Sequence, residues 1–193
     1  MSKANSTRLR IALEAEKLFV KKGYSLTSME DIMLASNASK GSIYYHFKNK
    51  EDLFLFIVEQ QGDVWKESWN VKEKQFSTAT DKLIGITKQY LEGFKNPLFS
   101  SSQDFSIFSV EFEKILSIIR KQYYGIYQQI FQEGINSFEF SPEDPETYMY
   151  IFLGMHIGLE HTAYYNNVTY EELEKLYLTA TNIFIKGIKH SNK

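Results

Sequence analysis

The sequence contains no cysteine and only three prolines among its 193 residues. The lack of cysteine excludes disulfides, thiol nucleophiles and thiolate metal sites, and it agrees with a reducing compartment. No run of 18 apolar residues occurs, and charged residues interrupt the first thirty, so neither a membrane span nor a signal-peptide core is expected. We therefore expect a soluble, cytoplasmic protein with no membrane partner, long enough to bury a core without cross-links.

Charge is distributed unevenly along the chain. Residues 1–50 hold nine Lys or Arg against four Asp or Glu, a balance of +5, and because the whole chain carries −2 the remainder carries −7. A basic first part followed by an acidic body favours contact between the first part and a polyanion. Chance clustering is the alternative that the charge balance alone leaves open.

Apolar residues recur at helical spacing, which predicts an all-α fold. The first helix is expected to end at Gly23, where the apolar period stops. The further helices are expected at residues 27–36, 39–47, 49 to beyond 65, 78–95, 103–137, 143–164 and 170–190.

Capping residues predict the boundaries of the short helices. Thr27 and Glu30 have the spacing of a capping box at the start of the second helix. Asn37 follows that helix and tolerates left-handed backbone geometry, so it can turn the chain sharply. Ser39 can then cap the third helix, and Asn49 the fourth.

Two short helices joined by a tight turn, within a basic three-helix unit, are typical of a helix-turn-helix DNA reader. The second helix of such a unit enters the major groove, where small residues let the backbone come close. The stretch SKGS supplies them with Gly41 and Ser42, and Lys40 can reach a guanine edge or a phosphate.

Polar side chains on either side of this stretch are candidates for phosphate contacts. The third helix continues into two tyrosines and a histidine as it passes the sugar-phosphate wall, and the second and fourth helices begin with polar residues. The side chains expected to contact phosphates are Thr27, Ser28, Tyr44, Tyr45, His46, Lys48 and Lys50. Partial packing of Tyr44 or Tyr45 against the first helix, and an inert surface position for His46, are the alternatives.

These residues resemble the DNA-binding domain of the TetR family of bacterial transcriptional regulators. The match runs from RIALEAEKLFVKKGY through TSMEDI to SKGSIYYHFKNKEDL. The resemblance implies a three-helix helix-turn-helix domain, residues 1–50, joined by a long helix to a helical ligand-binding and dimerisation domain, residues 51–193. It also implies a homodimer that binds a palindromic double-stranded DNA operator and is released by a small-molecule effector. By position, the family's DNA contacts fall on Thr27, Ser28, Lys40, Gly41, Ser42, Tyr44, Tyr45, His46 and Lys50.

The chain departs from similar family members in the second helix and the turn. Met33, Ser36 and Asn37 stand where small alanines and a turn glycine are common, and Ala38 replaces a common valine. These departures leave the expected fold intact and affect the pose of the third helix, and therefore the operator sequence.

Aromatic residues are abundant after residue 64 and predict a pocket for a flat or lipophilic effector. The predicted effector-binding residues are Trp65, Trp69, Phe105, Phe108, Phe112, Tyr123, Tyr127 and His156. Ordinary core packing is the alternative for each of them. Glu111 and Glu113 lie among these aromatics, and a buried carboxylate there could select a cation.

We expect no cofactor and no metal. Glu160 follows His156 by four residues and shares its helix face, but His161 does not, and the sequence offers no third ligand. The segment GMHIG and the stripe of Leu173, Leu176, Ala180, Ile183 and Gly187 in the last helix predict two helices of a dimer interface. Packing within one chain is the alternative.

The sequence thus predicts a ligand-responsive transcriptional repressor without catalytic activity. A DNA-binding activator or a ligand-independent regulator is the first alternative, because the sign of regulation depends on where the operator lies. A helical small-molecule enzyme or carrier is the second, although no nucleophile–base pair or phosphate loop is evident.

Overall fold

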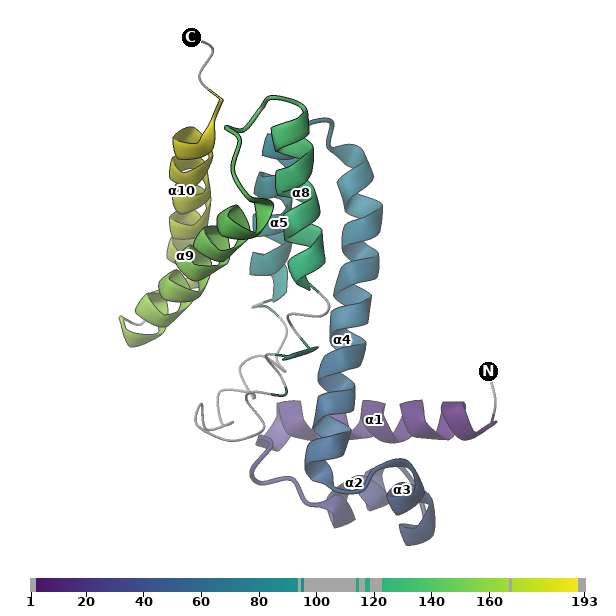
Figure 1. The fold of residues 1–193 in the computed structure, drawn as a ribbon. Helices are drawn as coiled ribbons and strands as arrows, with labels where there is room; N and C mark the ends of the chain where they lie inside the picture. Colours follow the sequence, from purple (N-terminus) through teal and green to yellow (C-terminus); the bar gives the residue numbers. More distant parts are fainter. Residues whose placement is uncertain are drawn as a thin grey trace. The chain divides into compact units, whose positions relative to one another are not determined.

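The computed structural model describes residues 3–93, 95, 114, 117–118, 123–166 and 168–190. Apart from an isolated bridge between Phe140 and Lys189, these residues contain no β-structure, so the expected all-α fold is confirmed. The helices, labelled in Figure 1, are α1 (Lys3–Lys22), α2 (Met29–Ala35), α3 (Lys40–His46), α4 (Lys50–Lys72), the short 3-10 helix η1 (Glu73–Gln75), α5 (Ala79–Gly93), α8 (Gly125–Asn136), α9 (Pro145–Tyr165) and α10 (Tyr170–Ile188). None of the described helices combines the length and the hydropathy that a membrane span requires.

The described residues form two compact units, and α4 contributes to both. The first unit holds the residues up to Trp65 together with those described between 95 and 118. The second unit holds residues 66–93 and the described residues from 123 onward. The division thus falls within α4, whereas the domain boundary predicted at residue 50 stays a prediction.

The first unit is built around one apolar core. Residues spaced three and four apart on α1 supply one side of it, and α2, α3 and the first half of α4 supply the rest. Burying these side chains stabilises the unit by roughly 1.5–3 kcal/mol for each large residue. The large side chains of this core, each at most 2% exposed, are Ile11, Phe19, Ile32, Ile43, Phe47, Leu53, Phe54 and Ile57.

The capping box of α2 lies one residue later than the sequence predicts. Ser28 is the N-cap, its hydroxyl accepting from the backbone amide of Asp31, and the Asp31 carboxylate accepts from the Ser28 amide. Thr27 instead turns its hydroxyl back onto the carbonyl of Gly23, at 2.8 Å, and is 1% exposed. The predicted Thr27–Glu30 box is therefore wrong, because Thr27 is used to close the end of α1.

The other predicted helix ends are confirmed. Gly23 ends α1 with φ of 84°, and Asn37 turns the chain with φ of 47°. Ser39 caps α3 by accepting from the Ser42 amide at 3.2 Å. The side chain of Asn49 accepts from the Asp52 amide at 2.7 Å at the start of α4.

In the second unit α5, α8, α9 and α10 pack on one another (Figure 1). Three of these helices lie where the sequence predicts them, and α8 is the described end of the helix expected at 103–137, most of whose earlier part lies outside the described residues. A carboxylate from a distant loop starts α5: Glu139 accepts from the amides of Ala79 and Thr80 at 2.9 and 3.0 Å. These bonds hold the pKa of Glu139 below its usual value, although burial opposes the shift.

Candidate functional site

The outer face of α3 is open. Ile43 and Phe47 point into the core, so Gly41 and Tyr45, one turn apart, lie on the opposite face. Tyr45 is 79% exposed, and Tyr44 beside it is 46% exposed. A Cβ atom added to Gly41 would meet nothing within 4 Å, so no contact inside the protein requires glycine there. This face is free to approach another molecule closely.

Positive charge beside this face lacks partners. Lys40 and Lys48 are exposed and form no ion pair with any described residue. Lys17 and Lys22 differ, because each lies within 2.7 Å of a carboxylate oxygen. Cations without an ion pair therefore lie at both ends of α3, where a polyanion would meet them.

Three consecutive aromatic rings, those of Tyr45, His46 and Phe47, lie at the C-terminal end of α3. The rings of Tyr45 and His46 meet edge to face with centroids 4.9 Å apart, and His46 in turn contacts Phe47 at 6.5 Å. Phe47 is buried while Tyr45 is exposed, so the row runs from the core to the surface. His46, between them in the chain, is half-buried.

Lys50 is engaged within the protein. Its ammonium donates to the carbonyl of Tyr24 at 2.8 Å and lies 4.2 Å from the centroid of the Tyr24 ring. Burial lowers its pKa. Lys50 thereby ties the first turn of α4 to the loop before α2. Its phosphate contact stays a prediction that would require the ammonium to share or leave these bonds.

The hydroxyls of Thr27 and Ser28 are also engaged. Thr27 donates to Gly23, and Ser28 donates to an Asp31 oxygen at 2.7 Å. The Lys22 ammonium and the Ser28 bonds hold the pKa of Asp31 well below its usual range. The predicted phosphate contacts of these two hydroxyls would require their hydrogens to leave the observed acceptors.

The structure describes only part of the predicted effector-binding set. Phe105, Phe108 and Phe112 lie outside the described residues. Trp69 is 1% exposed and stacks on Phe76 with centroids 6.0 Å apart, and its indole N–H finds no acceptor among the described residues. The remaining members are the half-buried Trp65 and Tyr123 and the buried Tyr127 and His156.

His156 lies in a stack of aromatic rings in the core of the second unit. Its ring is parallel to that of Tyr177, with centroids 4.9 Å apart, and meets the edge of Phe152 at 4.3 Å. Nε2 lies 3.2 Å from the hydroxyl of Thr181. Burial lowers the pKa of His156 to about 4, so the ring is neutral at physiological pH.

Two polar residues outside the predicted effector-binding set, Tyr90 and Glu160, complete this cluster. The hydroxyl of Tyr90 donates to a Glu160 oxygen at 3.0 Å, and burial raises the pKa of both groups. Tyr177 donates to the carbonyl of His156 at 2.9 Å. Spacing along one helix placed Glu160 on the same face as His156, whereas Tyr90 lies on α5, far away in the sequence. Among the described residues no three His, Asp or Glu side chains converge as metal ligands.

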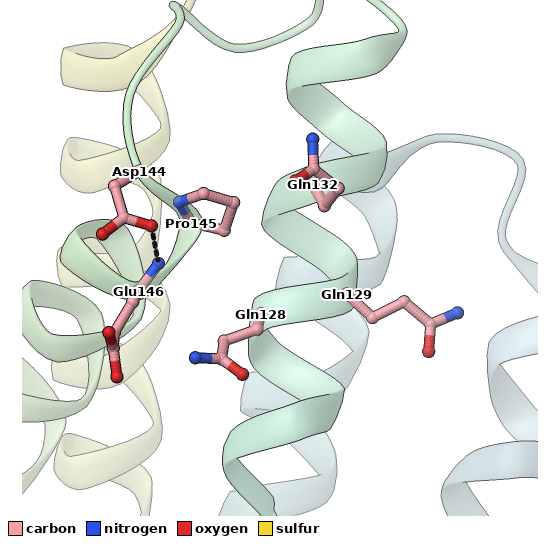
Figure 2. Close-up of a pocket in the computed structure, with 6 residues that line it drawn as sticks. All are labelled: Gln128, Gln129, Gln132, Asp144, Pro145 and Glu146. Carbon is pink, nitrogen blue, oxygen red and sulfur yellow. Dashed lines mark hydrogen bonds between the residues drawn. The ribbon is translucent and has the colours of Figure 1, made fainter.

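Two hollows of the surface lie elsewhere. One of about 400 Å³, shown in Figure 2, lies between α8 and the turn that opens α9, and Gln128, Asp144 and Glu146 contribute to it. The dashed line in Figure 2 is the 3.1 Å bond from the Glu146 amide to Asp144. A second, of about 250 Å³, lies between α1 and α4 in the first unit. No predicted effector-binding residue lines either hollow.

The arrangement of α2, the turn at Asn37 and α3, with a buried inner face and an open outer face, defines a helix-turn-helix DNA-binding domain. Residues 11–57 match the model of "Bacterial regulatory proteins, tetR family". Residues 61–190 match the model of "QacR-like protein, C-terminal region". The chain belongs to the TetR family of transcriptional regulators.

Individual relatives agree with this assignment. The chain is 29% identical over 185 residues to the HTH-type transcriptional regulator QacR of Staphylococcus aureus, covering 90% of this chain and 94% of that protein. It is 28% identical over 167 residues to the regulator YfiR of Bacillus subtilis, covering 79% of this chain and 78% of that protein.

Solved structures share the fold. A transcriptional regulator from Cytophaga hutchinsonii superimposes with a TM-score of 0.78 at 23% identity, covering 93% of this chain and 96% of that one. The regulator FadR of Bacillus subtilis, solved in complex with stearoyl-CoA, superimposes with a TM-score of 0.77 at 22% identity. The match covers 93% of this chain and 98% of that one. At these identities the similarity concerns the fold.

Proposed function

We propose that this protein is a transcriptional repressor that binds a palindromic operator as a homodimer and is released by a small aromatic or lipophilic effector. In this role it acts in the cytoplasm, where its DNA lies, and catalyses no reaction. The observation that carries the proposal is the outer face of α3, where Gly41 and the exposed Tyr45 lie between the unpaired Lys40 and Lys48.

In this proposal α3 lies in the major groove. The bare backbone at Gly41 allows close approach, and Lys40 and Ser42 reach base edges or phosphates from the same turn. Tyr44, Tyr45 and His46 then hydrogen-bond phosphate oxygens and fix the register without reading sequence. In this proposal the residues at the start of α3 determine which bases are preferred. The residues at its end contribute affinity for any sequence.

The dimer is proposed to form through α9 and α10. Ile157 on α9 and Ile183 on α10 are 58% and 65% exposed, which is unusual for isoleucine. Gly154 and Gly158 are exposed as well, and a Cβ atom at either would meet nothing within 4 Å, so packing within the described chain does not explain them. A second copy packed closely on this surface would explain both features.

The stripe predicted on α10 divides between two faces. Leu173 is only 9% exposed and Tyr177 is fully buried, so both belong to the core of the second unit. Leu176, at 40%, and Ile183 face outward, as does Gly187. The proposed interface therefore uses the second of these sets.

The effector is proposed to bind among the aromatic residues of the second unit. Trp69 supports this, because its buried indole N–H has no acceptor among the described residues and could donate to a bound molecule. Tyr127 and the stack around His156 supply further ring faces in the same unit. Such a site would take a flat or lipophilic molecule carrying a hydrogen-bond acceptor.

Helix α4 is proposed to connect the two activities. It is continuous from Lys50 to Lys72 and buries Phe54 and Ile57 in the first core and Trp69 in the second unit. An effector that displaces Trp69 would therefore move a helix that only three residues separate from α3. A dimer reads two half-sites about 34–36 Å apart, so a change in this spacing weakens operator binding.

The first test is selection of bound fragments from random duplex DNA by the purified protein. We expect a palindromic consensus whose affinity falls steeply with salt. Weak binding with no consensus would contradict an operator reader. Placing the selected site at the start of a reporter promoter then distinguishes a repressor, which lowers expression, from an activator.

The effector requires its own test. Linkage demands that an effector which releases DNA binds less tightly to the operator complex than to the free protein, by the same factor. Candidate aromatic and lipophilic compounds are screened for shifts in melting temperature, and those that bind are titrated by calorimetry with and without operator. Equal affinity in both titrations would contradict release by the effector.

A further inference from the structure

Arg8, on α1, lies against the end of α3. Its guanidinium carbon lies 4.0 Å from the centroid of the Phe56 ring and 5.3 Å from that of Phe47. Phe47 is the C-cap residue of α3, and Phe56 belongs to α4. The contact therefore joins α1 to the point where the chain leaves the DNA-reading helix for the long helix.

The charge of Arg8 has no counterion in the part of the chain that the structure describes. No carboxylate among the described residues pairs with it, and its buried Nε has no hydrogen-bond acceptor. A buried donor without an acceptor carries a desolvation cost that an apolar side chain would avoid. Packing against two rings does not by itself explain why a cation stands at this position.

His46 and Lys48 flank Phe47 in the chain, and Lys48 is exposed and unpaired. A guanidinium packed over aromatic rings can still offer N–H groups at its edge to a planar or tetrahedral anion. Arg8 itself is partly exposed.

We propose that Arg8 is a phosphate-binding residue, whose guanidinium, oriented by Phe47 and Phe56, binds a backbone phosphate of the duplex beside the end of α3. This inference rests on the proposed DNA-binding function. It adds α1 to the elements that hold the DNA. The contact is to the backbone, so it contributes equally to all sequences.

The salt dependence of duplex binding tests this. Arg8→Met keeps an unbranched apolar side chain on the two rings and removes the charge. We expect about a tenfold loss of affinity for operator and random duplex alike, and the slope of log K against log salt to fall by about one per protomer. Arg10→Met is the matched control, because Arg10 is exposed on the same helix without the ring contacts, and its slope should not change.

The alternative is that Arg8 only braces the fold. In that case Arg8→Met would lower the melting temperature and weaken binding with the salt slope unchanged, which would overturn the proposal. Arg8→Lys separates the two roles further, because it keeps the charge and loses the planar stack. We expect it to keep the slope.

A second measurement uses the wild-type protein and does not depend on how a variant folds. Phenylglyoxal modifies accessible guanidinium groups, and mass spectrometry reports each of the two arginines of α1 separately. We expect duplex DNA to protect Arg8 and to leave Arg10 reactive. Equal reactivity of Arg8 with and without DNA, or no reaction of Arg8 in the free protein, would overturn the contact.

The failure of this inference is distinct from the failure of the proposed function. If the wild-type protein binds no duplex in a salt-sensitive manner, the proposed function fails and the Arg8 contact with it. If the wild-type protein binds normally while Arg8→Met keeps its slope, the operator reader stands and only the Arg8 contact is overturned.

Discussion

Each compact unit contains a contact between a histidine and a tyrosine, and in both the ring centroids lie 4.9 Å apart. In the first unit Tyr45 and His46 meet edge to face, and the tyrosine is 79% exposed. In the second unit His156 and Tyr177 are parallel and at most 2% exposed. The same two residue types thus occupy a surface in one unit and a core in the other.

The difference lies in what their polar atoms do. The hydroxyl of Tyr177 donates to the carbonyl of His156, and His156 bonds Thr181, so the buried pair has its partners inside the protein. The hydroxyl of Tyr45 forms no hydrogen bond with any described residue and is open to an external acceptor. Residue type alone therefore does not distinguish the two tyrosines, whereas the unused hydroxyl on an exposed side chain makes Tyr45 the candidate for an external contact.

The largest predicted effect is a loss of folding stability in acid, caused by the buried His156. Burial lowers the pKa of His156 from 6.5 to about 4, so the unfolded chain takes up a proton between these pH values while the folded protein does not. Stability is therefore lost as pH falls from 6.5 to 4, by about 3 kcal/mol from this residue. Urea unfolding across this pH range measures the loss, and His156→Phe should remove it.

Glu160 acts in the opposite direction. Burial raises its pKa, so its protonation favours the folded state as pH falls. Glu160→Gln removes this contribution and should steepen the loss of stability in acid. Parallel pH profiles for the wild type and His156→Phe would show that His156 is not a buried neutral group.

Substitutions on the exposed surface of α9 and α10 should have the next largest effect, on dimer formation and on operator affinity. Ile157→Glu combined with Ile183→Glu places charges in the proposed interface and should yield a monomer in analytical ultracentrifugation. A monomer engages one half-site at a time, so operator affinity should fall at least about 100-fold. Val71→Glu is the control, because Val71 is 65% exposed on α4 and should leave the dimer intact. A double variant that remains dimeric would place the interface elsewhere.

The first unit was the more predictable from sequence because its signals are local. Ser39, Asn37 and Gly23 act on backbone atoms within a few residues of themselves, and their predicted roles are confirmed. The error at Thr27 has the same local origin. Two adjacent hydroxyl residues can both start a helix, and only the contact of Thr27 with Gly23 decides that Ser28 is the cap.

The second unit was less predictable because its contacts span long sequence separations. Tyr90 and Glu160 are 70 residues apart in the sequence, and Thr87 and Thr181 are 94 residues apart. No periodicity in the sequence links either pair. The helical period did predict where α9 and α10 lie, but one period could not assign Leu173 to the core and Ile183 to the surface. Which aromatic residues surround an effector stays a prediction for the same reason.

Gly41 allows the stability and the function of the first unit to be separated. Gly41→Ala should stabilise α3 by up to about 1 kcal/mol, because nothing obstructs the added methyl group in the free protein. The same methyl group should hold the backbone away from the major groove and weaken operator binding about tenfold. Gly125→Ala is the matched control, also unobstructed but on α8, and should not alter DNA binding. Gly41→Ala with unchanged affinity would mean that α3 does not approach the bases closely.

Tyr45→Phe is expected to have the smallest effect and to separate affinity from base preference. The change removes only the hydroxyl from a side chain that is 79% exposed, so the melting temperature should not move. Losing one phosphate hydrogen bond should weaken operator and random duplex alike, by about fivefold. Lys40→Met should in addition change which bases are selected, because Lys40 lies at the start of α3. If Tyr45→Phe changed the selected sequence instead, this tyrosine would be reading bases, and the division between the start and the end of α3 would need to be redrawn.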